Sequence, residues 1–304
     1  GQIMKILITG GTGTIGSSFI EKYPDHEYYN ISRNEKLVAE LKRKIPSVKT
    51  FLGSVEDYNF IRSTFQKVKP DVVIHAAALK HVDLAEKNPT QTVAVNVLGS
   101  LNIIKASIEE NVKITVAIST DKASSPQNTY GYSKSLMEKM FLDANTKKTK
   151  FAVCRFANVA HSNGSVIPYW KSLKNLSLPL RLTDPKMNRL VFSKEDAAAL
   201  IARVIDMCNK DDGGFVGSYK MKSVNMLRLA EVISSDIEIV GRRPGEKLDE
   251  DLISEAEVPY TYVDGDFIAI RNEINEGKNR IKSPYSSKNA PRMTRRELEG
   301  LLRE

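Results

Sequence analysis

Cysteine is nearly missing from this chain, which has two in 304 residues. Two thiols are too few for a disulfide framework or a four-cysteine metal centre. Cys154 falls in an apolar, strand-like run and Cys208 lies near the end of a helical pattern. We therefore expect two buried free thiols and predict no metal site.

Long hydrophobic runs are missing as well. No apolar stretch approaches the ~18 to 20 residues that a membrane helix needs. The first fifteen residues lead into a glycine-rich loop and not into a cleavable signal. These two absences predict a cytoplasmic protein without a membrane partner.

Charge of one sign does not dominate, although the net charge is +8, because 45 Lys and Arg are interleaved with 37 Asp and Glu. Basic residues gather only in short tracts such as 42–44 and 147–148, which solvated helix ends explain. We therefore expect no nucleic-acid partner. A basic surface does suit an anionic small molecule.

The first half of the chain alternates β-rich runs with longer stretches in which apolar residues recur with a 3.6-residue period. The β-rich runs predict strands at Lys5–Thr9, Tyr28–Ser32, Val48–Leu52, Asp71–Ala76, Ile114–Ser119 and Phe151–Arg155. The periodic stretches predict helices at Gly13–Lys22, Glu35–Lys44, Tyr58–Lys67, Thr90–Glu110 and Gly131–Ala144. This order is typical of an α/β fold with a doubly wound parallel sheet, in which the carboxyl ends of the strands share one edge.

A glycine-rich segment, Thr9-Gly-Gly-Thr-Gly-Thr-Ile-Gly16, follows the first predicted strand and opens the first predicted helix. Backbone N–H groups and the positive helix end can face a pyrophosphate there, and only glycine permits its close approach. The alternative is a tight strand-to-helix turn, which the five β/α units that follow make less attractive. The segment predicts cofactor contacts from Gly10, Thr12, Gly13, Thr14, Ile15 and Gly16.

The regular alternation weakens after about Arg155, where prolines and the pair Gly213-Gly214 appear. Isolated helices are predicted at Lys194–Met207 and Met226–Ser234. We predict a Rossmann-type nucleotide-binding domain at 4–155, whose sheet later strands of the C-terminal half can join. A smaller substrate-binding lobe is predicted at 156–304.

The end of the second predicted strand bears on the choice of nucleotide. A Rossmann site for NAD usually carries an acid there to hold the ribose 2′-hydroxyl. This chain has Ser32-Arg33-Asn34 instead, and a guanidinium and a hydroxyl suit a 2′-phosphate. NADP is therefore favoured over NAD; the alternative is that Arg33 is a solvated loop residue.

Tyr130 and Lys134 are spaced to lie one helical turn apart on one face of a helix. A free tyrosine has a pKa of about 10, so half-ionisation at pH 7 requires roughly 4 kcal/mol of stabilisation. Lys134 and a cationic nicotinamide can supply it. A surface helix pair has the same spacing, but the position after the fifth strand favours a catalytic role.

Ser119-Thr120-Asp121-Lys122, at the end of the fifth predicted strand, adds an acid and a base to this site. A dehydratase has a use for them, because it removes a carbon-bound proton next to a ketone while it protonates the departing hydroxyl. Lys122 and Asp121 can share those tasks. The alternative is a solvated loop pair.

The glycine-rich loop, the Ser/Thr-rich strand end and the Tyr/Lys pair together resemble the short-chain dehydrogenase/reductase superfamily, and this implies that Thr120 hydrogen-bonds the reacting sugar hydroxyl. Four segments resemble, more closely, UDP-N-acetylglucosamine 4,6-dehydratases of the extended type. They are His75–Val82, Ser119–Ala123, Gly164–Pro168 and Arg243–Leu248.

This resemblance implies a reaction in which Tyr130 deprotonates the 4-hydroxyl of a UDP-sugar, NADP takes and returns a hydride, and Lys122 and Asp121 eliminate water. It also implies a homo-oligomer, a dimer or larger. Tyr130 and the lack of a membrane segment resemble the soluble type, which inverts carbon 5. A UDP-sugar 4-epimerase, which does not need Asp121-Lys122, and a non-catalytic NADP-binding regulator remain alternatives.

Further contacts follow from the resemblance alone. Beyond the glycine-rich loop, Ser32 and Arg33, it implies cofactor contacts from Ala76, Ala77, Ala78, Lys80, Asn96, Tyr130 and Lys134. It implies substrate contacts from Lys80, Asn158, Ser165, Val166, Arg189, Arg243 and Glu246. Two of these have structural alternatives: Asn96 can satisfy buried backbone groups, and Glu246 can cap a helix after Pro244.

Three positions depart from the pattern of the resembled family. Ser54 stands where an aspartate contacts the adenine, Asp83 replaces a proline, and Asn163 stands where an arginine precedes Gly164. The departures put the adenine contact and the identity of the sugar in question, but they leave the predicted chemistry intact.

Overall fold

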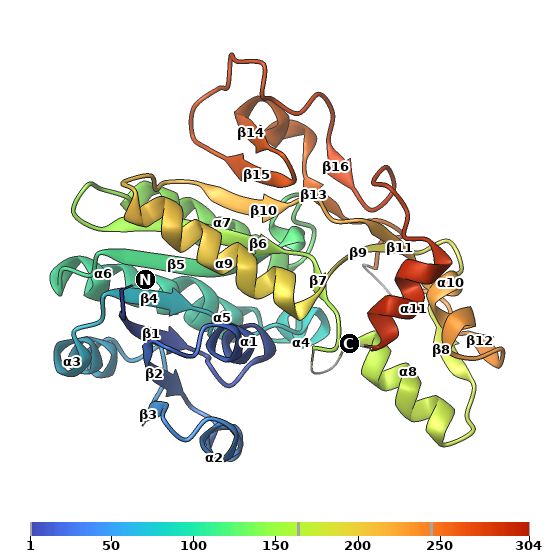
Figure 1. The fold of residues 1–304 in the computed structure, drawn as a ribbon, viewed down its shortest axis with the longest axis horizontal. Helices are drawn as coiled ribbons and strands as arrows, with labels where there is room; N and C mark the ends of the chain where they lie inside the picture. Colours follow the sequence, from blue (N-terminus) through green and yellow to red (C-terminus); the bar gives the residue numbers. More distant parts are fainter. Residues whose placement is uncertain (1, 163–164, 244–245, 304) are drawn as a thin grey trace.

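The structure, a computed structural model, describes residues 2–162, 165–243 and 246–303. Within these residues, nine strands form one sheet in the order β14-β15-β10-β6-β5-β4-β1-β2-β3 (Figure 1). Neighbouring strands from β3 to β10 in this order pair in parallel. β15 pairs antiparallel with β10, and β14 pairs antiparallel with β15 at the same edge. The strands are β1 Lys5–Thr9, β2 Glu27–Ser32, β3 Lys49–Leu52, β4 Val72–His75, β5 Ile114–Thr120, β6 Lys150–Phe156, β10 Val216–Tyr219, β14 Thr261–Asp264 and β15 Phe267–Ile270. The predicted α/β fold with a parallel Rossmann-type sheet is confirmed.

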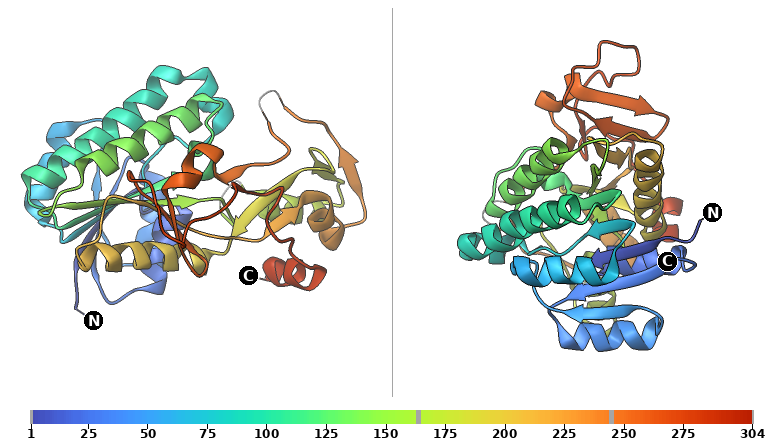
Figure 2. Two further views of the ribbon diagram at one scale, coloured as in Figure 1. Left: turned by 90° about the horizontal axis from the view of Figure 1, so that it is seen from above. Right: turned by 90° about the vertical axis from the view of Figure 1, so that its left-hand side faces the viewer.

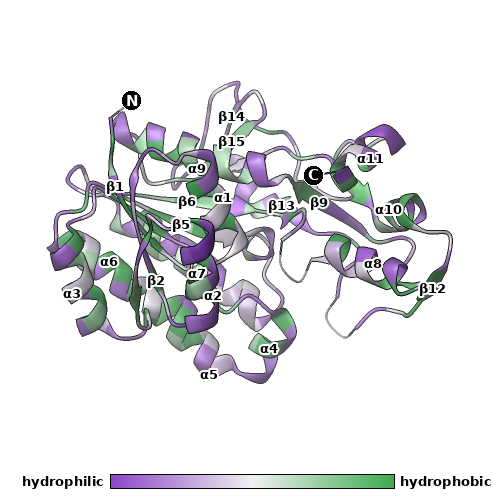
Figure 3. Ribbon diagram, turned by 60° about the horizontal axis from the view of Figure 1, so that its bottom comes forward, coloured by the Kyte–Doolittle hydropathy of each residue, from purple (hydrophilic) through white to green (hydrophobic). Residues whose placement is uncertain are grey.

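Helices cover both faces of this sheet, each over its own apolar core (Figure 2). One core takes side chains from α1 Thr14–Lys22, α2 Glu35–Lys44 and α9 Lys194–Asn209. The other takes side chains from α3 Tyr58–Val68, α6 Gly99–Glu109 and α7 Thr129–Ala144. The strands are largely hydrophobic because both of their faces are covered, whereas the outlying α2 is mostly hydrophilic (Figure 3).

The predicted helix Thr90–Glu110 is not one regular α-helix. It consists of α5 Pro89–Thr92, the π-helical η1 Val93–Leu98, and α6. π-Helical turns are often found at functional sites. Here the turn carries Asn96, whose side chain is buried between the chain after β4 and α7.

The C-terminal half contributes a smaller lobe beside the carboxyl ends of the parallel strands (Figure 1). Its core contains Trp170, Leu229 and Leu298. The elements of the lobe are β7 Asn158–Val159, α8 Val166–Asn175, β8 Leu180–Leu182, β9 Asn188–Phe192, β11 Ser223–Asn225, α10 Met226–Ile233, β12 Ile237–Ile239 and α11 Arg295–Arg303.

The chain passes between the two parts more than once. It leaves the sheet after β6, returns for β10, enters the lobe again, and returns for β14 and β15. Short elements mark these passages: α4 Val82–Lys87, η2 Asp121–Ala123, β13 Asp251–Ile253, η3 Glu255–Tyr260 and β16 Tyr285–Ser286. Both cysteines are buried and free, as expected from their sequence context.

Candidate active site

The glycine-rich loop approaches the chain after β4 very closely. Gly10 has a φ of +74°, and a Cβ there would lie 2.9 Å from the amide nitrogen of Ala77. A Cβ at Gly16 would lie 2.8 Å from the Cα of Gly11. Glycine is therefore required by backbone conformation and by space. Gly13 is the N-cap of α1, so the positive end of that helix opens beside the loop.

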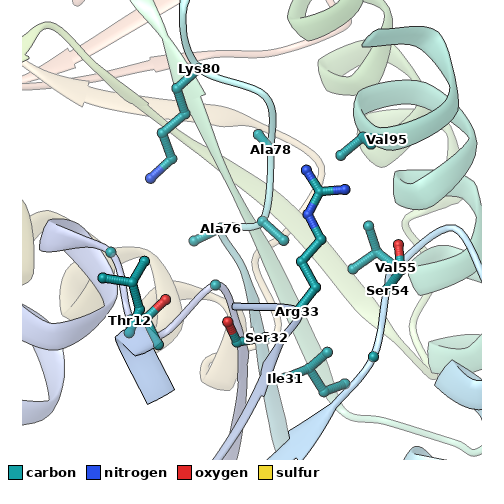
Figure 4. Close-up of a pocket in the computed structure, with 15 residues that line it drawn as sticks. Thr12, Ile31, Ser32, Arg33, Ser54, Val55, Ala76, Ala78, Lys80 and Val95 are labelled. Atoms are coloured by element: carbon teal, nitrogen blue, oxygen red, sulfur yellow. The ribbon is translucent and has the colours of Figure 1, made fainter. Parts of the chain in front are cut away.

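A cavity of about 220 Å³ lies between this loop and the ends of β2 and β4 (Figure 4). Arg33 and Lys80 project into it from different elements. The predicted cofactor residues that line it are Gly10, Thr12, Gly13, Ser32, Arg33, Ala76, Ala77, Ala78 and Lys80. Thr14 lines a neighbouring pocket together with Thr12. The cavity thus brings residues from the ends of four parallel strands, β1 to β4, to one place.

Arg33 and Ser54 define the end of the cavity next to β3. The Arg33 side chain is 53% exposed, and its Nη1 lies 4.0 Å from Oε2 of Glu56. Ser54 also lines the cavity and donates a hydrogen bond of 3.2 Å to the same carboxylate oxygen. At position 54 the chain therefore has a hydroxyl that bonds Glu56 in place of the charged aspartate side chain.

A second cavity of about 120 Å³ adjoins the first and contains the predicted hydride-transfer residues. Thr120, Tyr130 and Lys134 line it, with Ile15 and Gly16 at the helix end. The two cavities share the lining residues Gly10, Ala76, Ala78 and Lys80. A ligand bound along the glycine-rich loop can therefore extend to Tyr130.

The start of α7 fixes the place of Tyr130 and Lys134. The Asn128 side chain caps the helix by accepting a 2.8 Å hydrogen bond from the Gly131 amide. A Cβ at Gly131 would lie 2.7 Å from the Lys122 carbonyl oxygen, so the helix end packs directly on the loop after β5. This contact brings the Tyr/Lys pair and the Asp/Lys pair together.

Burial governs the electrostatics of the Tyr/Lys pair. It raises the pKa of Tyr130, with a further increase from the charge of Asp121, while a hydrogen bond with Thr120 lowers it. Burial and then the charge of Lys80 lower the pKa of Lys134 to about 7, against the opposite effect of Glu138. The Lys134 ammonium group donates to the Ile118 carbonyl oxygen at 2.9 Å. The protein alone therefore does not make Tyr130 a strong base.

Asp121 is 2% exposed, and its two carboxylate oxygens differ. Oδ1 accepts a 3.3 Å hydrogen bond from Thr120 and lies 3.7 Å from Nζ of Lys122. Among the described residues, buried Oδ2 has no hydrogen-bond partner. A buried polar atom without a partner is unusual and calls for an explanation, such as a ligand that supplies the bond.

Lys80 is the only predicted substrate residue that lines the two cavities, as far as the described ranges extend. Its ammonium group lies inside, and burial lowers its pKa, although the residue as a whole is exposed. The structure does not bring the other six substrate residues into these cavities.

Arg189 and Glu246 bind the protein backbone. The Arg189 guanidinium donates to the carbonyl oxygens of Lys247, Leu248 and Asn188 at 2.8 to 3.1 Å. The Glu246 carboxylate accepts the Arg243 amide at 2.9 Å.

The remaining substrate candidates lie along the smaller lobe. Asn158 is exposed in β7 and donates to Leu190 O at 3.3 Å. Ser165 is the N-cap of α8, has a buried hydroxyl without a partner among the described residues, and is followed by Val166 at the helix start.

Asn96 makes its three hydrogen bonds within the protein. Its side chain accepts the Leu79 amide at 2.9 Å and donates to the Leu79 carbonyl oxygen at 3.1 Å and to Ser133 Oγ at 3.0 Å. It thereby joins the chain after β4 to α7.

Of the two remaining departures from the family pattern, Asp83 and Asn163, the structure describes only Asp83. Asp83 lies in the first turn of α4, where negative charge is favourable. Asn163, Gly164 and Pro244 lie outside the described residues.

Comparison with protein families identifies the group to which this site belongs. The family described as polysaccharide biosynthesis protein matches residues 6–272. The chain belongs to this family. Its members are short-chain dehydrogenases/reductases of the extended type, the group that the sequence motifs resemble.

Curated relatives of this polysaccharide biosynthesis protein carry three different descriptions. UDP-N-acetylglucosamine 4,6-dehydratase (inverting) of Campylobacter jejuni is 36% identical over 88% of this chain and 83% of its own length. UDP-glucose 4-epimerase of Rickettsia bellii is 31% identical over 98% of this chain and 94% of its own. Uncharacterized membrane protein MJ1061 of Methanocaldococcus jannaschii is 35% identical over 98% of this chain and 95% of its own.

Solved structures of similar fold include Pen from Bacillus thuringiensis, with a TM-score of 0.90 and 29% identity over 99% of this chain and 97% of that one. WbmG of Bordetella bronchiseptica, solved in complex with NAD and UDP, has a TM-score of 0.68 and 22% identity over 81% of this chain and 84% of that one. In the described part of this polysaccharide biosynthesis protein, no helix is both long and apolar enough to cross a membrane.

Sequence reasoning missed several charged residues that surround the Asp121-Lys122 loop. Arg155, 1% exposed, binds the carboxylates of Glu138 and Glu257. Glu250 is also buried, and burial raises its pKa. The sequence pattern indicates only that Arg155 ends a strand. Glu250 and Glu257 lie in or beside stretches without a periodic pattern. A buried arginine signals acid partners, but the sequence does not identify them.

Proposed function

We propose that this protein is a dehydratase that uses NADP to convert UDP-N-acetylglucosamine into a UDP-4-keto-6-deoxy sugar with inversion at carbon 5. The observation that carries the proposal is the buried Asp121 beside Lys122, packed against the helix start that bears Tyr130 and Lys134. The similarity to the inverting dehydratase of Campylobacter jejuni supports the same reaction.

The residues present fit a nicotinamide nucleotide. Gly10 and Gly13 leave space that a Cβ would fill, within 2.9 Å of Ala77 N and 3.0 Å of Lys80 Nζ respectively. The helix end of α1 suits the pyrophosphate, and the adjoining cavity leads to Tyr130. When bound, such a nucleotide accepts a hydride and returns it. WbmG, a protein of the same fold, binds NAD, which supports a nucleotide of this class.

Ser32 and Arg33 favour NADP over NAD. Both line the cavity at the end of β2, where a 2′-phosphate would lie if the nucleotide follows the glycine-rich loop. Glu56 competes for Arg33, but at 4.0 Å and with the arginine half exposed the pair is weak. The guanidinium therefore remains available to a phosphate.

In the first half of the reaction, Thr120 hydrogen-bonds the 4-hydroxyl of the sugar and Tyr130 takes its proton. Because burial raises the pKa of Tyr130, its ionisation requires positive charge nearby. Lys134 is the cation on the same helix, and its pKa of about 7 leaves it partly protonated at neutral pH. Loss of hydride from carbon 4 gives a 4-ketone.

In the second half, the ketone makes the carbon 5 proton acidic. Lys122, as the neutral amine, takes this proton, and Asp121, as the carboxylic acid, donates a proton to the 6-hydroxyl, which leaves as water. A bound nicotinamide nucleotide would hold the hydride lost from carbon 4 and would return it to carbon 6. The sugar loses one water with no net oxidation. A proton from solvent, added to carbon 5 from the side opposite to Lys122, inverts that centre.

The direct test is incubation of the NADP-loaded enzyme with UDP-N-acetylglucosamine, followed by mass spectrometry. We expect a product lighter by one water, and we expect Lys122→Ala to lower its rate of formation by roughly 100-fold or more. Full turnover by the Lys122→Ala variant would contradict this proposal.

A UDP-sugar 4-epimerase is the second candidate, favoured by the similarity to the Rickettsia bellii enzyme over 98% of this chain. It would use the nucleotide cavity and Tyr130 but would have no use for Asp121 and Lys122. An epimerised product of unchanged mass would support it. A cytoplasmic location and a homo-oligomeric assembly remain predictions.

A further inference from the structure

Two consecutive serines tie the loop after Asp121-Lys122 to a distant part of the chain. Ser124 Oγ donates to Oε1 of Glu257 at 2.7 Å, across 133 positions of sequence. Ser125 Oγ donates to Oδ2 of Asp251 at 3.0 Å, across 126 positions. Lys247 Nζ adds a longer bond of 3.3 Å to the Ser125 carbonyl oxygen. We call Lys247, Asp251 and Glu257 the brace.

The acceptor at Glu257 is itself held firmly. Arg155 donates to Oε1 at 3.0 Å and to Oε2 at 2.8 Å, a two-bond arrangement that fixes the orientation of the carboxylate. Ser254 also donates to Oε1, from its amide at 3.0 Å and its hydroxyl at 3.1 Å. The positive charge of Arg155 lowers the pKa of Glu257. The group that receives the Ser124 hydroxyl is thus a carboxylate in one fixed position.

Arg155 extends this arrangement to α7. It donates to Oε2 of Glu138 at 3.0 Å and to Oε1 at 2.6 Å, and Glu138 lies one helical turn beyond Lys134. The hydroxyl bonds of Ser124 and Ser125, by contrast, directly hold the loop that carries Asp121 and Lys122. The Tyr/Lys pair has its own support in the Asn128 cap. Removal of the two serine hydroxyls leaves the Asn128 cap and the bonds from Arg155 to Glu138 in place, so the Tyr/Lys pair keeps these supports.

Position matters for an acid and a base that must reach two different atoms of one sugar. A misplacement of about 1 Å can lower a rate by roughly 100-fold. The only side-chain bond within the acid-base pair is weak, with 3.7 Å between Lys122 Nζ and Asp121 Oδ1. The loop itself contains a single 3-10 turn, η2, and hydrogen bonds in such turns have poorer geometry than those of an α-helix.

We propose that Ser124 and Ser125 are positioning residues, which hold the Asp121-Lys122 loop against the brace and thereby set the rate of water elimination without setting the rate of oxidation at carbon 4. This inference rests on the proposed dehydratase function. It gives the segment around Glu257, which has no periodic sequence pattern, a role in the active site.

The test is the double variant Ser124→Ala/Ser125→Ala of the NADP-loaded enzyme. We expect the rate of dehydrated product to fall roughly 10- to 100-fold at saturating UDP-N-acetylglucosamine, with KM nearly unchanged. We also expect reduced nicotinamide to accumulate, seen by its absorbance, because oxidation continues while elimination is slow. Ser124→Thr on the Ser125→Ala background keeps a hydroxyl at 124 and should recover part of the rate.

The matched control is Ser107→Ala, which removes another buried serine hydroxyl, bonded to Thr115 at 2.9 Å and remote from the loop. It should leave both half-reactions unchanged. If the double variant slows oxidation and elimination equally, or slows neither, the positioning role is wrong.

A second measurement separates this inference from the proposed function. Amide hydrogen exchange of peptides covering residues 119–126 should be faster in the double variant than in the wild type and the Ser107→Ala control. Unchanged exchange would overturn the coupling. A wild-type enzyme that forms no dehydrated product would refute the dehydratase function, while the exchange measurement would still decide on the coupling.

Discussion

Lys134 is 4% exposed, and its place inside the protein has consequences for stability. The ammonium group donates to the Ile118 carbonyl oxygen at 2.9 Å. Burial and then the neighbouring Lys80 lower its pKa from 10.5 to about 7. A cation kept at this site without a carboxylate in contact costs folding free energy, which is tolerable where the lysine serves a ligand.

We expect the free energy of unfolding of the nucleotide-free protein to contain a term that rises with pH from about 7 to 10.5. In this window the unfolded state binds the Lys134 proton and the folded state does not, so the term grows by at most ~1.4 kcal/mol per pH unit. Lys134→Met removes the term. Denaturant unfolding at several pH values should therefore show a smaller rise in the variant, while Lys139→Met, exposed on the same helix, should retain it. Parallel curves for wild type and Lys134→Met would refute this.

The proposed preference for NADP depends on Arg33, which lines the cavity. In Arg33→Asp a carboxylate would repel the 2′-phosphate and could accept a ribose hydroxyl. We expect the affinity for NADP to fall about 10- to 100-fold, the equivalent of one charge-assisted hydrogen bond, and NAD to bind at least as well as before. Calorimetric titration with both nucleotides measures this. Arg43→Asp, at the end of α2, is the control, and equal losses in the two variants would count against a specific contact.

In the loop between β1 and α1, position 10 requires glycine for two reasons: its φ is positive, and a Cβ would lie too close to Ala77. We expect Gly10→Ala to destabilise the protein by roughly 1 to 3 kcal/mol more than Gly265→Ala. Both positions have positive φ, +74° and +61°, but a Cβ at Gly265 meets nothing within 4 Å. Gly10→Ala should also lose nucleotide binding. Equal unfolding free energies for the two variants would contradict the close approach to Ala77.

Local patterns in the sequence were sufficient for the elements of the first half. α2 spans Glu35–Lys44 as predicted, because its apolar stripe is regular and Asn34 caps it by accepting the Leu37 amide. The six predicted strands β1 to β6 agree within one residue at each end. β14, β15 and η3 were missed because they are short and their segment has no clear period.

The candidate site could be predicted only in part for the same reason. Gly10, Tyr130 and Lys134 belong to motifs with short spacing. The three residues line the two adjoining cavities. Partners such as Ser124 and Glu257 are separated by 133 positions. Their pairing depends on how the C-terminal segment returns to the sheet, and no local pattern records it.

At the scale of the whole molecule, the predicted homo-oligomer requires a surface to associate. Several large apolar side chains are exposed on α7 and on the two elements that it contacts, α4 and η1: Leu84, Val93, Leu98, Tyr132 and Leu136. Exposed apolar residues that lie together indicate an association surface. We expect Leu98→Arg/Leu136→Arg to shift the protein to a monomer in light scattering after size exclusion. Leu176→Arg, 68% exposed on the smaller lobe, should not, and an unchanged mass of the double variant would exclude this surface.

In the proposed function, Asp121 and Lys122 turn an oxidoreductase site into one that eliminates water. The most direct measurement is the reaction of the NADP-loaded enzyme with UDP-N-acetylglucosamine in deuterated water, with the product examined by mass spectrometry and NMR. We predict a 4-keto-6-deoxy product that has lost one water, carries solvent deuterium at carbon 5 and has inverted configuration there. A product of unchanged mass that differs only at carbon 4 would contradict the claim.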